Sequence, residues 1–177
     1  MTVVVAAYDL GPQAAHMAWH ILAMNVVAPV LAALLAWHVP RGRPRWFWLA
    51  GVGQVALLWA AHVPAIHNAA MHGPPKALLH ATLLLCAVLF WTSLLALPQQ
   101  RRWHAVAALL LTGKLVCLLA ALLVFAPRAL YAVHHGGSAD DQQLAALLMI
   151  TTCPLSYLVA AIVIAAALVH RAQRAPA

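Results

Sequence analysis

The chain has 177 residues, of which 66% are hydrophobic and only 7% are charged, whereas soluble proteins carry about 25% charged residues. A soluble domain of this length has too little interior to bury so much apolar surface, so lipid must cover it. The net charge of +7 comes from basic residues scattered between apolar blocks, which excludes a groove-sized patch for nucleic acid. The sequence therefore predicts an integral membrane protein.

Five apolar blocks are long enough to cross a hydrocarbon layer of roughly 30 Å as helices. They cover residues 15–37, 46–64, 77–97, 103–126 and 143–169. Apolar and polar residues do not alternate along the blocks, which argues against a barrel, and a bilayer offers the backbone no other hydrogen-bonding partner. We therefore expect an all-α fold in which residues 1–177 form a single polytopic transmembrane helix bundle.

The basic residues predict the orientation of these spans. Seven of the ten lie in the first connection, the third connection and the tail, which fall on one side of a five-span chain: Arg41, Arg43, Arg45, Arg101, Arg102, Arg171 and Arg174. The positive-inside rule makes this side cytoplasmic, with the N-terminus outside and the C-terminus inside. The first fourteen residues contain no basic segment, so we expect no cleaved signal peptide.

Histidine is the unusual residue of this chain, with eleven copies. His38, His104 and His170 fall at the predicted cytoplasmic ends. The other eight fall at or near the predicted outer face: His16, His20, His62, His67, His72, His80, His134 and His135. Histidines at an interface often place one ring face in lipid and the other in water, so a purely structural reading stays open for each.

His16 and His20 are one helical turn apart, so their imidazoles can share one metal ion. Met17 and Met24 lie on neighbouring faces, and thioether beside imidazole suits copper, particularly the cuprous ion. Short connections would bring more histidines to the same rim, namely His62, His67 and His80. His134 and His135 adjoin two glycines, and a solvated loop is the simpler interpretation for them.

Two further positions are open to more than one interpretation. Asp140 and Asp141 precede the last block and are placed to cap its helix; Asp141 is also a candidate metal ligand. Lys114 falls near the middle of the fourth block, where a lysine costs around 2.5–3.5 kcal/mol and normally faces the bundle interior or water.

The cysteines are expected to be small buried residues, although a ladder of thiolates that passes a soft ion is conceivable. They lie near the middle of three different blocks: Cys86, Cys117 and Cys153. No soluble-enzyme motif is present, and three acidic residues give carboxylate chemistry little material. We therefore expect no catalytic activity.

Four segments resemble, in order, the caa3-type cytochrome c oxidase assembly factor family, the CtaG-like membrane proteins. They are HMAWH at 16–20 followed by Met24 and AP at 28–29, Trp59 with HVP at 62–64, HAT at 80–82 leading to LFW at 89–91, and DQQLA at 141–145. Family members usually have about seven spans, so the resemblance implies a shortened member. Leu79 stands where the family has an acid.

The resemblance implies a helper in the assembly of a haem–copper cytochrome c oxidase in the bacterial cytoplasmic membrane. Such a helper would bind or present copper at the outer face, with an oxidase subunit or a copper donor protein as its partner. We expect His16 and His20 to hold the copper, assisted by His62, His67, His80, Met17 or Asp141. A membrane electron carrier with b-type haem and a copper permease are the alternatives.

Overall fold

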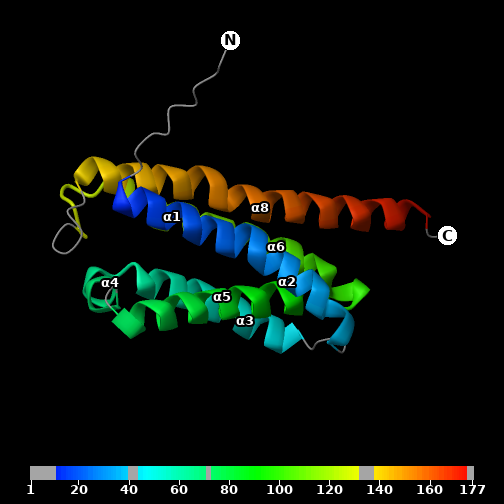
Figure 1. Cartoon of the computed structure of the whole chain (residues 1–177). Helices are drawn as coiled ribbons and strands as arrows, with labels where there is room; N and C mark the ends of the chain where they lie inside the picture. The colour runs from blue at the N-terminus through cyan, green and yellow to red at the C-terminus, as the bar shows by residue number, and fades with distance from the viewer. Residues whose placement is uncertain (1–10, 40–43, 71–72, 132–137, 175–177) are drawn as a thin grey trace, which may run out of the picture.

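The computed structural model describes residues 11–39, 44–70, 73–131 and 138–174. Every regular element in these ranges is a helix, and the helices run side by side in a bundle (Figure 1). The predicted all-α fold is therefore confirmed. Five residues that the sequence singled out lie outside the described ranges: Arg41, Arg43, His72, His134 and His135.

The first candidate span is a composite helix of 27 residues. It runs through α1 (Pro12–Leu22), a π-helical turn (Ala23–Val27), α2 (Ala28–Leu35) and a final 3₁₀ turn (Ala36–His38). Pro29 lacks the N–H that an α-helix requires at its position. The π turn directly before it widens the helix, so the chain continues through the proline without ending.

The second apolar block is a helix broken near its end. The helix α3 spans Pro44–Ala61, and α4 spans Pro64–Ala70 after a bend of 82°. Pro64 is well suited to begin α4, because a proline in the first helical turn loses no intrahelical hydrogen bond. The break at 62–63 makes this pair either one bent span or a re-entrant segment.

Three long helices complete the bundle. They are α5 (Gly73–Leu95), α6 (Arg102–Val124), which follows a short 3₁₀ turn, and α8 (Ala139–Arg174). The described helices therefore give four candidate spans, or five when the bent pair is included. This range contains the predicted number, and the chain is a multi-pass membrane protein.

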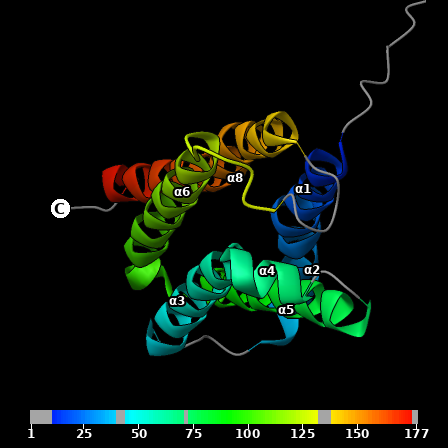
Figure 2. The same ribbon diagram turned by 90° about the vertical axis from the view of Figure 1, so that its left-hand side faces the viewer.

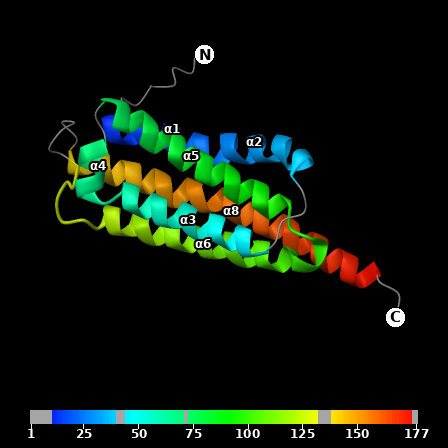
Figure 3. The ribbon, with the colours of Figure 1, turned by 90° about the horizontal axis from the view of Figure 1, so that it is seen from below.

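The helices form a closed ring. The helix α8 packs against α6 and α1, and α5 packs against α2 and α3, while α3 and α6 close the circle. Figure 2, which looks along the bundle, shows this ring, and Figure 3 shows α8 extending beyond its neighbours at the C-terminal end. One end of the bundle contains the start of α1, the bend between α3 and α4 and the start of α5; we call it the histidine end.

Small and aromatic side chains fill the middle of the ring. Alanines that are fully buried, such as Ala28 and Ala87, let helix backbones approach closely, as is typical of membrane helices. Phe90 is also fully buried, and the Trp91 ring stacks on the Tyr157 ring at 5.6 Å. Many leucines and valines point outward with about half of their surface exposed, which fits contact with lipid.

Two polar bonds cross between helices at the depth of this core. The Gln54 side-chain N–H donates to the Tyr157 hydroxyl at 2.8 Å and so joins α3 to α8. The Ser156 hydroxyl donates to the Asn25 amide oxygen at 2.5 Å and so joins α8 to the π turn. Such bonds hold membrane helices in register because no water competes for the partners.

The bond between Gln54 and Tyr157 predicts a measurable stability effect. Tyr157→Phe should lower the free energy of unfolding by about 1–2 kcal/mol, because it leaves the buried Gln54 amide unpaired. The double variant Gln54→Leu with Tyr157→Phe should lose less, since it removes both polar groups. Unfolding in detergent measures both, with Thr82→Val as a control, because Thr82 bonds only within its own helix. Equal losses in the two variants would contradict this interpretation.

Candidate metal-binding pocket

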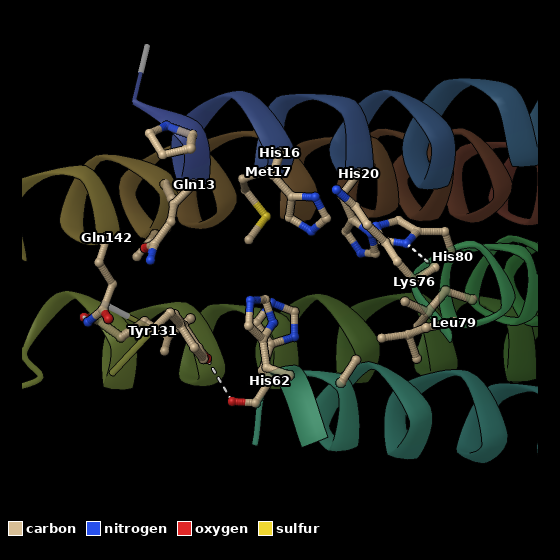
Figure 4. A pocket seen from close by; sticks show the side chains of 17 residues that line it. Gln13, His16, Met17, His20, His62, Lys76, Leu79, His80, Tyr131 and Gln142 are labelled. Carbon is tan, nitrogen blue, oxygen red and sulfur yellow. Dashed lines mark hydrogen bonds between the residues drawn. The ribbon is translucent and has the colours of Figure 1, made fainter. Parts of the chain in front are cut away.

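Five histidines from separate parts of the chain line one pocket at the histidine end (Figure 4). They are His16 and His20 from α1, His62 from the bend after α3, His67 from α4 and His80 from α5. The cavity has a volume of about 140 Å³, which is enough for a small hydrated ion. The predicted gathering of outer-rim histidines is therefore present in the fold.

The rings form a connected set around His16. Its centroid lies 6.5 Å from that of His20, 6.3 Å from that of His67 and 4.9 Å from that of His80. The His20 ring in turn lies 6.4 Å from the His62 ring. Two imidazoles bound to one ion through nitrogens at about 2 Å have centroids about 5–6 Å apart, so these separations are close to those of shared coordination.

Hydrogen bonds fix the tautomers of two of these rings. The Nδ1–H of His62 donates to the Leu58 carbonyl at 2.8 Å, and the Nδ1–H of His80 donates to the Lys76 carbonyl at 2.6 Å. A carbonyl only accepts, so Nδ1 carries the proton and Nε2 keeps its lone pair in the neutral ring. This arrangement, with one nitrogen bonded to the backbone and the other available, is typical of metal-binding histidines.

His20 and Gln13 add polar atoms that have no partner within the described chain. His20 is 8% exposed, and its Nε2 is buried without a hydrogen bond; both side-chain polar atoms of Gln13 are likewise buried and unbonded. Both residues line the pocket, as does the buried Met17, whose thioether enters it in Figure 4. Buried polar atoms are normally bonded, so the pocket is chemically suited to a polar or ionic guest.

No three His, Cys, Asp or Glu side chains in the described ranges stand together in a metal-ligating arrangement. The His80 ring meets the His16 ring edge to face, with 90° between the ring planes. Because no three described donors converge, binding a metal here requires rotation about side-chain torsions. The pocket brings together Met17 and the five histidines of the predicted ligand set, while Met24 does not line it.

Asp141 has a role that the sequence did not predict. It lies in the first turn of α8, but its carboxylate accepts the backbone N–H groups of Gln13 at 2.9 Å and Ala14 at 3.0 Å, in the first turn of α1. The residue at the N-cap of α1 is Gly11, which has no side chain to satisfy these amides. Asp141 therefore caps a different helix from its own, and it is absent from the pocket lining.

Gln142 and Tyr131 tie the connection after α6 to the same pocket. The Gln142 oxygen accepts the Leu130 N–H at 2.7 Å, while its side-chain N–H donates to the Leu123 carbonyl at 3.2 Å. The Tyr131 hydroxyl donates to the His62 carbonyl at 2.6 Å. Burial raises the pKa of Tyr131 to about 12, so the hydroxyl keeps its proton at neutral pH. No pattern in the sequence identified Tyr131, whereas Gln142 lies inside the DQQLA segment.

The remaining candidate residues lie away from the pocket. His38, His104 and His170 lie at the opposite end, where the His104 ring stacks on Trp103 at 3.7 Å. Lys114 was expected to face the interior or water, but its side chain is exposed on the outer face of α6. Cys153 is buried, as expected, while the other two cysteines are half-buried and all three are free thiols.

Comparison with known proteins agrees with the sequence resemblance. The family model described as the cytochrome c oxidase caa3 assembly factor matches residues 2–171. The match includes every residue that lines the pocket, and it includes Asp141 with the two residues of α1 whose amides it accepts. No curated protein and no solved structure matches the chain.

The bonds from the Asp141 carboxylate to the first turn of α1 predict that substituting Asp141 lowers stability strongly and specifically. Asp141→Ala should cost about 2–3 kcal/mol, because it removes two charge-assisted bonds and leaves buried amides unpaired. Gly11→Ala should act in the same direction, since a Cβ there would lie 2.2–2.5 Å from the Asp141 carboxylate atoms. Thermal unfolding in detergent measures both. The exposed neighbour gives the control, Asp140→Ala, which should change stability by less than about 0.5 kcal/mol; equal losses at the two aspartates would refute this role of Asp141.

Proposed function

The chain belongs to the cytochrome c oxidase caa3 assembly factor family, and we propose that it serves oxidase assembly by holding a copper ion in the histidine pocket. The ion is cargo, held for transfer to the oxidase or to a copper protein that serves it. His16 and His20 supply the first two ligands from one face of α1. His62, His67, His80 and Met17 are the further donors that surround them.

One observation carries this proposal: imidazoles from α1, the bend and α5 converge in a single cavity with ring centroids 4.9–6.5 Å apart. Interfacial histidines without a common role would point outward to lipid headgroups instead. The backbone bonds of His62 and His80 leave their Nε2 lone pairs available. The buried Nε2 of His20 supplies another donor without a partner.

The charges around the pocket favour a monovalent soft ion. Its nitrogen and sulfur donors are neutral, while Lys76 adds a positive charge to the lining. The carboxylate of Asp141 is committed to the amides of α1. Hard divalent cations require oxygen ligands and negative charge, whereas imidazole with thioether suits Cu(I). The donor set therefore supports cuprous copper.

The distribution of arginine supports an outward-facing pocket in a bacterial cytoplasmic membrane. The described arginines of the first and third connections and of the tail lie at the end opposite the pocket: Arg45, Arg101, Arg102, Arg171 and Arg174. By the positive-inside rule that end is cytoplasmic. Copper would then be received and released on the outer side, with the C-terminus inside.

The first test is copper retention by the purified protein. Under reducing conditions with a competing chelator, the wild type should keep one Cu(I) per chain. His16→Ala with His20→Ala should weaken binding by more than about 100-fold, beyond the 10–100-fold effect typical of losing an outer-shell partner. Copper analysis after gel filtration measures the stoichiometry, and chelator competition measures the affinity.

The matched control for this test is His38→Ala with His170→Ala, which removes two exposed histidines from the opposite end. This variant should bind copper as the wild type does. Unchanged copper content in the His16 and His20 double variant would reject the ligand assignment. A Soret band in protein purified from haem-replete cells would instead favour the b-type haem carrier.

The second test is made in cells. Deletion of the gene should lower caa3 oxidase activity. Added copper should restore part of that activity, because a higher copper concentration favours copper loading of the oxidase even without the helper. The gene carrying the His16 and His20 substitutions should behave like the deletion, and the His38 and His170 control should complement it. A change in copper uptake or tolerance that persists without the oxidase would favour the permease instead.

A further inference from the structure

Lys114 is a charged group whose placement the pocket does not explain. It lies ten residues before the end of α6 at Val124 and twelve after its start at Arg102, or about 15 Å and 18 Å along the helix axis. A lysine side chain reaches about one helical turn toward an interface. Its ammonium therefore stays at the depth of the hydrocarbon, where charges are normally paired or functional.

The side chain points away from the bundle. A Cβ placed on the preceding residue, Gly113, would lie 3.8 Å from the Tyr157 Cβ and 3.9 Å from the Pro154 Cα of α8, so this side of α6 faces inward. Lys114 is exposed on the other side, between Leu111, which is 53% exposed, and Leu118, which is 50% exposed. Within the described residues no ion pair is found for it. The apolar outward face of α6 thus carries one charged side chain, Lys114, at the depth of the hydrocarbon layer and facing lipid.

No acidic residue in the described part of this chain, or of a second copy, lies at the depth of Lys114. The acidic residues number three: Asp9, Asp140 and Asp141. Asp140 and Asp141 lie in the first turn of α8 at the histidine end, and Asp9 precedes α1, so the sequence from residue 10 to 139 contains no acid at all. A symmetric pairing of two α6 helices would also place two lysines against each other, which is unfavourable.

We infer that the outward face of α6, centred on Lys114, docks a transmembrane helix of a different protein that carries an Asp or Glu side chain at the same depth. Charge complementarity identifies the occupant, because an ammonium in hydrocarbon is stabilised most by a carboxylate brought to it. The flanking leucines supply the apolar contact on either side of the pair. This surface is on the opposite side of α6 from α8, and the inference does not depend on copper binding.

The test uses the full chain in its native membrane, with a photo-crosslinking amino acid at Leu111 or at Leu118. We expect a crosslink to one membrane protein, and mass spectrometry should place it next to an Asp or Glu within a span. Lys114→Met should lower the crosslink yield at least about tenfold, whereas Lys114→Arg should keep at least half of it. A probe at Leu85, which is 57% exposed on α5, is the matched control and should not give this product.

Charge reversal identifies the pair directly. Lys114→Glu should abolish the crosslink, and replacing the partner's acid with lysine in the same cells should restore it. The purified Lys114→Met protein should melt no lower than the wild type and should load copper equally, which separates docking from folding and from the metal site. Crosslinks to lipid or to a second copy alone, an undiminished yield in Lys114→Met, or a crosslinked segment without an acid would each overturn the inference.

Discussion

The interaction on which the pocket depends is the contact between the Asp141 carboxylate and the first turn of α1. Two amides at 2.9 and 3.0 Å hold the start of α1 against the start of α8. His16 and His20 lie within the next turns of α1, so this contact sets where both imidazoles stand relative to the rest of the ring. A helix N-terminus also carries partial positive charge, and the carboxylate neutralises it where water is scarce.

The Asp141 contact also accounts for the chemical character of the pocket. Both oxygens of Asp141 are engaged by α1, so this acid contributes to the structure of the site and not to its ligand charge. The polar groups that line the cavity are then neutral imidazoles, one thioether, amide groups, the Tyr131 hydroxyl and the ammonium of Lys76. A pocket of this composition disfavours hard divalent ions, which agrees with the soft monovalent ion that we propose as its cargo.

The sequence predicted the helices, and it indicated that short connections would bring several histidines to one rim, because both follow from local and near-local rules. Long apolar blocks in lipid must be helical, and short connections place the histidine-bearing ends of neighbouring helices together. It did not predict the partner of Asp141, since a carboxylate before a helix is equally suited to capping its own helix. The contact spans more than a hundred residues, and only tertiary structure distinguishes the two. The sequence also could not predict that Lys114 points outward. Apolar residues lie on all sides of α6, so the sequence pattern does not identify its inner face.

The break after α3 positions His67 better than a straight helix through the second apolar block would. His67 lies five residues beyond His62, which in a continuous helix would carry it about 7.5 Å further along the axis and away from the cavity. The bend of 82° turns α4 across the end of the bundle instead. His67 then lies 6.3 Å from His16 and 4.3 Å from the Tyr131 ring, measured between ring centroids. Tyr131 in turn bonds the carbonyl of His62 at the bend itself. The broken helix, which weakens the second apolar block as a membrane span, is therefore the feature that brings His67 to the cavity.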